Sequence, residues 1–297
     1  MARERWMLGD ASIELVAARE NYVFCVKTSV ASYALRLHRQ GYRSVEEIHS
    51  ELSWMFRLAV KQIPVPNPVS AVDGNSVQII KGVIVDMLTW LDGTRLSEFQ
   101  ATEEIYFQLG SLLAQMHIAT DSWEPPDTFS RPTWDLAGSQ PTWGRFWSNP
   151  LLTSDQKDRF LEFRENACSA LEKLQQPDCG LIHADLVPDN VLYNGQDIQV
   201  IDFDDGGFGY RLFDLATISH RSKRLSGADD LTNAVVAGYG KHRPLDVGSL
   251  PLFEALRACT YVGWNISRMS EPGGVERNER FITEAEVSVS NYYRSVA

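Results

Sequence analysis

The N-terminal part of the chain consists of short runs rich in β-branched and aromatic residues, separated by turn residues. Residues 22–26 and 32–37 predict a strand hairpin, and residues 77–80 and 83–88 predict a further strand pair. Residues 1–16 predict a short element ahead of them, with apolar positions near its end. The pattern therefore favours a small antiparallel sheet at this end of the chain.

Apolar positions at helical spacing dominate the remainder of the chain. The helix expected at 44–61 begins at Ser44, and Glu47 three residues later completes a capping box. The glycines of residues 206–209 predict a flexible turn, and residues 270–277 predict a loop. Helical spacing predicts further helices at residues 102–118, 154–175, 212–223, 231–239, 250–269 and 281–293.

Four polar residues follow one another in the stretch 181–216: His183, Asp185, Asn190 and Asp202. Four residues, one of them a proline, separate Asp185 from Asn190, so we expect both on one loop. A carboxylate that orients a hydroxyl and accepts its proton, beside a metal that binds phosphate oxygens, is what phosphoryl transfer requires. The stretch is therefore the first candidate for a catalytic site.

A hairpin is predicted between Asn190 and Asp202. Residues 191–193 and 198–201 have strand character, and the Asn-Gly pair at 194–195 is a strong turn signal because both residues tolerate positive φ. The return strand would bring Asp202 back beside Asn190. Mg²⁺ is a hard cation that prefers oxygen ligands, so a carboxylate and an amide oxygen suit it. The sequence therefore predicts a magnesium site at this point.

Structural roles compete with these interpretations. A lone histidine such as His183 is more often a core residue that bonds the backbone than a catalyst. Asp214 can equally cap a helix or anchor the loop. For these two residues taken singly the structural role is favoured, whereas the ordered set with its hairpin favours chemistry.

The order His-x-Asp-x4-Asn followed by Ile-Asp-Phe is that of the catalytic and metal loops of kinases. The stretch resembles the aminoglycoside phosphotransferase and choline kinase superfamily, whose pattern also fits the later Asp214-Leu215-Ala216. The resemblance covers nearly the whole chain in element order. It implies an α+β, bilobal protein-kinase-like fold, with a small antiparallel β-sheet N-lobe that carries one main helix and a larger, mainly helical C-lobe.

The resemblance also implies nucleotide-binding residues in the N-lobe. Arg36 stands where the fold has a strand lysine that pairs the phosphates, and its planar fork can bind a phosphate and a carboxylate together. Glu51 stands where the family's helix glutamate would pair with that cation. Lys27 is the alternative to Arg36, and Glu47 is the alternative to Glu51. A solvated helix position is the structural alternative for Glu51.

A turn is predicted at residues 17–21, between the N-terminal element and the first hairpin strand. Protein kinases have a glycine-rich loop here, and this chain has none. Some members of the resembled family have Glu-Asn at this turn, as Glu20-Asn21 here. On that basis Asn21 and Tyr22 are candidates for phosphate contact, with an ordinary hairpin turn as the alternative.

The end of the last predicted strand looks like the link between lobes, where kinase-like folds bind the adenine edge through backbone groups. This makes Met87, Leu88, Thr89 and Trp90 candidates for adenine binding. The predicted division follows: residues 1–91 form a nucleotide-binding lobe, and residues 92–297 form a catalytic and acceptor-binding lobe.

Acceptor residues are less well defined. Asp204 and Asp205 follow the metal aspartate, and they would bind a second metal or a substrate ammonium, or else cap the next element or face water. Trp264 lies on a helix that, in the resembled family, closes the acceptor pocket. Aromatic faces suited to a cation also occur in residues 121–150, although packing is the better interpretation for any one of them. The tryptophans of that segment are Trp123, Trp134, Trp143 and Trp147.

Charge and composition exclude several classes of protein. A net charge of -11 argues against a nucleic-acid binder, which needs a basic surface to neutralise phosphates. No apolar run approaches the roughly 20 residues of a membrane span, and no apolar signal core opens the chain. The cysteines lack close pairing, which is typical of reduced thiols and predicts a cytoplasmic protein.

The main hypothesis is an ATP-dependent phosphotransferase that uses Mg²⁺ and acts on a hydroxyl of a small, amine-bearing metabolite or aminoglycoside-like acceptor. One alternative is a serine/threonine protein kinase of the bacterial stress-response type, which the Phe-Asp-Asp at 203–205 also resembles. Another is a nucleotide-binding regulator without turnover. The sequence leaves open the acceptor, ATP or GTP as the donor, the number of metal ions and the oligomeric state.

Overall fold

The computed structural model describes residues 1–18, 21–137 and 139–297, which divide into two compact units. Unit 1 comprises Met1–Gln100, Ile118–Arg131 and Pro188–Asp204. Unit 2 comprises Ala101–His117, Pro132–Val187 and Asp205–Ala297. The lobe boundary expected near residue 91 remains a proposal.

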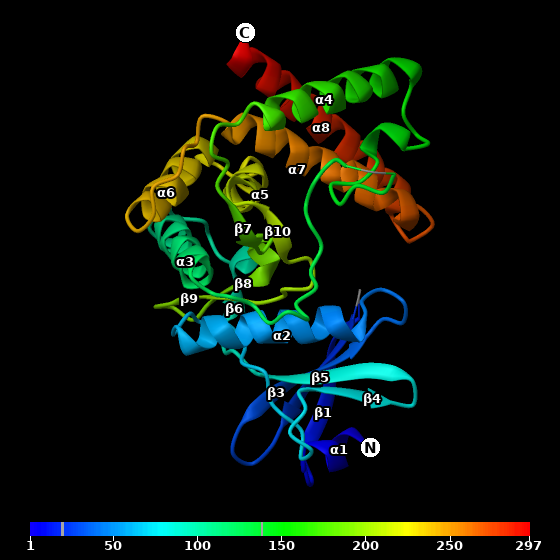
Figure 1. Cartoon of the computed structure of the whole chain (residues 1–297), viewed down its shortest axis with the longest axis vertical. Coiled ribbons are helices and arrows are strands. Elements are labelled where there is room, and N and C mark those ends of the chain that lie inside the picture. Colours follow the sequence, from blue (N-terminus) through cyan, green and yellow to red (C-terminus); the bar gives the residue numbers. More distant parts are fainter. Residues whose placement is uncertain (19–20, 138) are drawn as a thin grey trace. The chain divides into compact units, whose positions relative to one another are not determined.

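The larger sheet of unit 1 is antiparallel, with strand order β1-β2-β3-β5-β4 (Figure 1). Its strands are β1 (Ser12–Ala18), β2 (Asn21–Lys27), β3 (Ser32–His38), β4 (Val77–Ile80) and β5 (Val83–Thr89). The predicted hairpin and strand pair are both present. The turn predicted at 17–21 is wrong at its edges, because Ala18 belongs to β1 and Asn21 begins β2, and Arg19 and Glu20 lie outside the described residues.

Helix α2 (Val45–Val60) begins at the predicted capping box. The Ser44 hydroxyl accepts a hydrogen bond from the Glu47 amide, and the Glu47 carboxylate accepts one from the Ser44 amide. These contacts satisfy amides that the first helical turn leaves without an intrahelical partner. The buried face of α2 carries apolar residues at helical spacing, among them Ile48, Leu52 and Met55.

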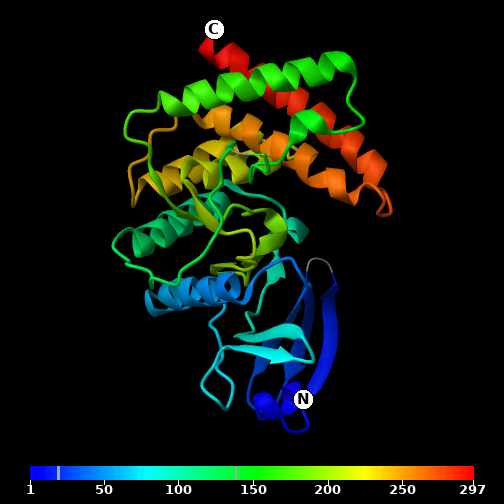
Figure 2. The ribbon, with the colours of Figure 1, turned by 45° about the vertical axis from the view of Figure 1, so that its right-hand side comes forward.

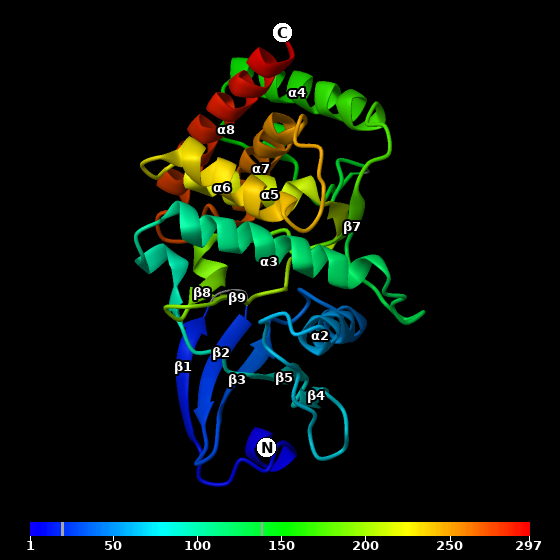
Figure 3. The same ribbon diagram turned by 90° about the vertical axis from the view of Figure 1, so that its left-hand side faces the viewer.

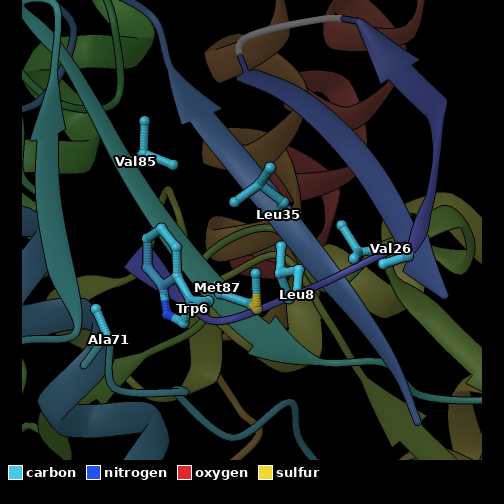
Figure 4. Packing of buried hydrophobic residues seen from close by; sticks show 8 residues of the cluster. Trp6, Leu8, Val26, Leu35, Ala71, Val85 and Met87 are labelled. Carbon is cyan, nitrogen blue, oxygen red and sulfur yellow. The ribbon is translucent and has the colours of Figure 1, made fainter. Parts of the chain in front are cut away.

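The N-terminal segment contributes to the core of unit 1. After α1 (Ala2–Arg5), Trp6 and Leu8 pack with Val26, Leu35 and other buried residues of the sheet (Figure 4). The indole of Trp6 also donates a hydrogen bond to the Val69 carbonyl at 2.9 Å. The segment is therefore fixed by burial of its apolar side chains and by a satisfied polar group.

A second, smaller sheet of unit 1 has strand order β6-β8-β9. Its strands are β6 (Thr94–Arg95), β8 (Val191–Tyr193) and β9 (Ile198–Val200). The predicted hairpin is present, with Val191 opposite Val200. At its turn the Asn194 side chain accepts hydrogen bonds from the Gln196 and Asp197 amides, and Gly195 has a φ of 95°.

Unit 2 is mainly helical. Its helices are α4 (Ser154–Glu172), α5 (Leu212–Ser222), α6 (Ala228–Gly240), α7 (Leu250–Trp264) and α8 (Gly274–Val296), together with most of α3 (Glu103–Asp121). Helix α7 packs against both α5 and α8 (Figure 3). Helix α4 crosses α8, where Phe163 lies edge-on to Tyr292 (Figure 2). None of the helices in the described ranges is long and apolar enough to cross a membrane.

Two sequence predictions in unit 2 are wrong. The expected turn at 206–209 is largely strand β10 (Gly207–Tyr210), which pairs antiparallel with β7 (Cys179–Ile182). A Cβ at Gly209 would come within 2.6 Å of the Ile182 side chain, so the glycine serves close approach and not flexibility. The loop expected at 270–277 ends early, because α8 already begins at Gly274.

Glycines allow close packing of α3 and α6, and this gives a testable prediction. A Cβ at Gly110 would lie 2.0 Å from the Val235 carbonyl oxygen, and one at Gly238 would lie 2.0 Å from the Phe107 carbonyl oxygen. Because overpacking of this kind costs about 1–3 kcal/mol, Gly110→Ala should lower the free energy of unfolding measured in urea. Gly240→Ala is the matched control.

Gly240 also lies in α6, and a Cβ there would meet nothing within 4 Å. The control should be neutral or slightly stabilising, since alanine is the better helix former. Equal midpoints of unfolding for Gly110→Ala and the wild type would contradict the close packing.

Candidate active site

Asp214, which is fully buried on α5, holds the backbone of the loop that carries Asp185. The Asp214 carboxylate accepts hydrogen bonds from the amides of His183 (2.9 Å) and Ala184 (2.7 Å). Its Oδ2 also lies 3.1 Å from His117 Nε2, and His117 Nδ1 lies 2.8 Å from the Tyr239 hydroxyl. Burial raises the pKa of Asp214, but its hydrogen bond and charge interaction with His117 outweigh that effect and lower it. Asp214 thus anchors the loop backbone, as one of its two interpretations expected.

His183 is also buried, and its Nδ1 accepts a 3.3 Å hydrogen bond from the Asp185 amide. This contact is what the structural interpretation of His183 expects. Ala184, the residue between them, has a φ of 64°, a left-handed conformation that is uncommon for a residue with a side chain. The hydrogen bonds from Asp214 and His183 hold this strained turn, and a catalytic role for His183 stays a prediction.

Asp185 is the partly exposed member of the loop, with 28% of its side chain accessible. Its Oδ1 lies 2.5 Å from Nη2 of Arg257, a buried residue of α7. No sequence motif pointed to Arg257, because it lies 72 residues further along the chain. The signal available was a charged residue, close to Glu254, in the middle of a mainly apolar helix.

Asn190 and Asp202 lie at the same end of the β8–β9 hairpin, within unit 1. The Ile201 amide donates a 3.0 Å hydrogen bond to the Asn190 carbonyl, which continues the ladder one step beyond Val191 and Val200. Asn190 is buried, whereas Asp202 is exposed and has a φ of 68°. An amide oxygen and a carboxylate are the donor types that a hard divalent cation prefers, so this pair fits such an ion.

The residues after Asp202 are held in place by two arginines. Arg131 donates hydrogen bonds to the carbonyls of Phe203 (2.9 Å) and Asp204 (2.6 Å), and Arg43 donates one to the Asp204 carbonyl (2.8 Å). The Phe203 ring is fully buried and lies edge-on to Trp54 of α2 at 5.0 Å. The backbone conformation at Asp202 is therefore set by long-range contacts and not by the local sequence.

The predicted ion pair between Arg36 and Glu51 is present and buried, at 2.7 Å. Arg36 is also bound by Asp86 of β5: Nε donates to Oδ1 and Nη2 donates to Oδ2, each at 2.8 Å. The alternative Glu47 instead pairs with Arg43 at 3.3 Å. Glu51 is thus not a solvated helix position, and Asp86 is a partner that the sequence did not indicate.

A histidine completes this buried network. His38 Nε2 lies 2.5 Å from Asp86 Oδ2. Burial raises the pKa of Asp86, but the charge of Arg36 and the hydrogen bond to His38 outweigh burial and lower the pKa to about 2. Asp86 is therefore an ionised group whose charge is matched inside the sheet of unit 1.

The other predicted nucleotide residues already have partners within unit 1. Asn21 Oδ1 accepts a 3.3 Å hydrogen bond from the Arg39 amide, and Tyr22 is exposed. Met87 and Leu88 are buried in β5, and the Met87 carbonyl accepts from the Val69 amide. The Thr89 and Trp90 amides donate to the carbonyls of Asn67 (2.9 Å) and Ser32 (3.1 Å). Nucleotide contact by these six residues stays a prediction.

The predicted acceptor residues differ in their surroundings. Asp204 is buried with its Oδ1 3.7 Å from Arg43, and Asp205 is half-buried with its carbonyl bonded to the Trp134 indole. The ring of Trp264 lies 4.0 Å from the Arg268 guanidinium and 5.6 Å from that of Arg277. Since two cations already face this ring, it is poorly suited to hold a substrate ammonium, and an acceptor role for these residues stays a prediction.

The tryptophans of residues 121–150 pack as their structural interpretation expects. Trp143 is fully buried. Its ring is stacked with that of Tyr210 and tilted against that of Phe213. Trp134 is also buried, at 5.3 Å from the Phe213 ring. These two indoles belong to the core of unit 2.

The chain belongs to the phosphotransferase enzyme family, whose model matches residues 12–246. It is 30% identical over 267 residues to the homoserine kinase of Polaromonas naphthalenivorans (strain CJ2), covering 84% of this chain and 78% of that protein. It is 25% identical over 224 residues to the amicoumacin kinase of Bacillus subtilis (strain 168), covering 73% of this chain. That match spans 65% of the amicoumacin kinase, slightly less than two thirds of its length.

Solved structures support the same fold. A microcompartment-associated aminopropanol kinase superposes with a TM-score of 0.84 at 28% identity, covering 99% of this chain and 95% of that one. An amicoumacin kinase in complex with AMP-PNP and Ca²⁺ superposes with a TM-score of 0.83 at 21% identity, covering 96% of this chain and 91% of that one. The chain has the expected α+β, protein-kinase-like fold, and it is an ATP-dependent phosphotransferase that acts on a hydroxyl of a small molecule.

The buried Asp86 gives a prediction about stability and pH. Its pKa is about 2 in the folded chain against an ordinary value of 3.8, so its contribution to stability is complete above the ordinary value and is lost as the pH falls towards 2. Asp86→Asn removes the charge and leaves Arg36 with one carboxylate fewer. We expect it to lower the free energy of unfolding near neutral pH by about 3 kcal/mol.

The measurement is urea unfolding between about pH 7 and about pH 2. The difference between wild type and Asp86→Asn should shrink as the pH falls through this range. Asp158→Asn, which alters an exposed carboxylate of α4, is the control and should leave the curve unchanged. A difference that does not depend on pH would contradict the ionised state of Asp86.

Proposed function

We propose that this phosphotransferase uses Mg²⁺-ATP to phosphorylate a small, amine-bearing alcohol. The observation that carries the proposal is the hairpin that returns Asp202 to the end where Asn190 lies, with the Asp185 loop directly preceding it in the chain. An amide and a carboxylate are therefore available at one end of the hairpin, and they are the oxygen donors that a hard cation on phosphates prefers.

Each residue of the motif has a defined task. Asn190 and Asp202 hold Mg²⁺, which supplies positive charge to the phosphate oxygens. Asp185 orients the acceptor hydroxyl. The acceptor oxygen forms a bond to the γ-phosphorus while the bond to the β–γ bridging oxygen breaks, the hydroxyl proton passes to Asp185, and ADP leaves.

Arg36 is the proposed cation for the nucleotide phosphates. Its guanidinium has five N–H donors, of which the contacts to Asp86 and Glu51 engage three. The two carboxylates fix the guanidinium plane, so its remaining donors point in a defined direction. Backbone groups of residues 87–90 are the proposed adenine contacts, and the division into lobes near residue 91 belongs to the same proposal.

The proposed class of acceptor is based on the names of two relatives and on the net charge of the chain. Homoserine and aminopropanol, which two of the relatives are named for, both carry a hydroxyl a few carbons from an amine. The net charge of -11 agrees with a cationic acceptor.

A panel of amino alcohols, homoserine, aminoglycosides and a generic protein substrate, assayed for ADP release, tests the proposed acceptor class directly. Transfer to the protein substrate alone would indicate a protein kinase, and no transfer to any would indicate a regulator.

Asp185→Ala tests the catalytic assignment. We expect kcat to fall by at least about 10²-fold, because the variant loses the group that orients and deprotonates the hydroxyl. The Kd for ATP, measured by calorimetry, should change less than about twofold, since Asp185 has no assigned contact with the nucleotide. Asp197→Asn, in the hairpin turn, is the control and should retain wild-type kcat; full activity of Asp185→Ala would overturn the assignment.

Asp202→Asn tests the metal assignment. The Mg²⁺ concentration that gives half-maximal rate should rise more than about tenfold. Mutation of residues that only hydrogen-bond to a metal ligand already lowers metal affinity by about that factor, and Asp202 is proposed as a ligand itself. The same shift should appear in the Mg²⁺ dependence of nucleotide binding, a readout that does not need turnover. Identical Mg²⁺ titrations of wild type and variant would exclude Asp202 as a ligand.

A further inference from the structure

The buried Arg257 of α7 is bound to the loop that carries Asp185. Its Nη2 lies 2.5 Å from Asp185 Oδ1, and its Nη1 donates a 3.0 Å hydrogen bond to the Ala184 carbonyl. Only 3% of the Arg257 side chain is accessible. All these residues belong to unit 2, so the contacts are internal to one compact body.

The side chain of Arg257 is held from its other side by aromatic rings. Nη2 donates a 2.6 Å hydrogen bond to the Tyr261 hydroxyl, and the guanidinium carbon lies 4.3 Å from the Tyr261 ring centre and 5.9 Å from that of Phe213. Tyr261 in turn stacks on Phe281 of α8 at 5.0 Å. The guanidinium plane is therefore fixed by packing, and lysine has no planar fork with which to reproduce these contacts.

The neighbours of Arg257 stabilise the charged form of its guanidinium. Burial lowers the pKa of Arg257, but Tyr261 and Asp185 outweigh burial and raise it, so the group remains a cation. A buried cation is stable only beside an opposite charge or several acceptors, and here the carboxylate of Asp185 meets it.

We propose that Arg257 is a positioning residue for phosphoryl transfer: it fixes the orientation of the Asp185 carboxylate. The inference rests on the proposed role of Asp185. The loop is then held from two directions, since Asp214 binds its amides while Arg257 binds its carbonyl and its acidic side chain. Asp185 thereby faces the acceptor hydroxyl as an oriented acceptor of a proton.

The test is steady-state kinetics of the full-length enzyme at saturating Mg²⁺-ATP, with the amino alcohol of the panel that is turned over fastest. In Arg257→Met we expect kcat to fall by about 10²-fold, because the carboxylate of Asp185 loses the group that orients it, while the KM for ATP changes little. Arg257→Lys keeps the charge but loses the planar fork, so its kcat should fall as well.

Arg159→Met is the matched control, because it removes an arginine that pairs with Glu286 at 2.8 Å elsewhere in unit 2. Its kcat and its KM for ATP should match those of the wild type. If Arg257→Met does not fold, Arg257→Lys decides the matter: a folded Arg257→Lys enzyme with wild-type kcat overturns the proposal. A folded Arg257→Met enzyme with wild-type kcat also overturns it.

The variant Asp185→Ala distinguishes failure of the proposed role of Asp185 from failure of the proposed role of Arg257. If that variant retains full turnover, the proposed role of Asp185 fails and the role of Arg257 fails with it. If Asp185→Ala is inactive while Arg257→Met keeps the kcat of the wild type, only the positioning role of Arg257 is wrong.

Discussion

Ionised groups are removed from water in both compact units, and each must meet a partner of opposite charge or a set of hydrogen-bonding groups. In unit 2 the buried Asp214 meets two loop amides and His117, and the buried Arg257 meets Asp185. The loop that carries the catalytic motif is the place where these requirements converge. Its strained turn at Ala184 persists because polar groups on both sides would lose their partners if the loop relaxed.

The same constraint shapes unit 1. Arg36 joins strands β3 and β5 to helix α2 by binding Asp86 and Glu51, with both carboxylates fully buried. Arg131 extends this system, since it lies 3.5 Å from Glu51 and donates to the backbone that follows Asp202. An arginine suits the strand position because its planar fork binds two carboxylates at once, which the single ammonium of a lysine does less well. Arg36, Glu51 and Arg131 therefore form one system of buried charges that reaches the backbone after Asp202.

Local patterns predicted much of the fold because they depend on short-range physics. The capping box of Ser44 and Glu47 and the hairpin around Asn194 are set by residues within a few positions of one another. The turn predicted from the glycines before Tyr210 is wrong because the role of these glycines depends on a long-range contact. Glycine permits a turn, but it also permits close strand packing, and only the closeness of the Ile182 side chain to Gly209 decides between them.

The sequence by itself determined the order of Asp185, Asn190 and Asp202 and the hairpin that joins the last two, since these follow from spacing and residue chemistry. The pairing of Arg36 with Glu51 was expected from the family resemblance, and the structure contains it. Only the tertiary structure decided that Asp86 shares Arg36 and that Arg257 binds Asp185. These partners lie 50 and 72 residues apart, and nothing in either local segment encodes the other. Long-range charge pairing depends on how helices and strands pack, which a single sequence does not specify by pattern.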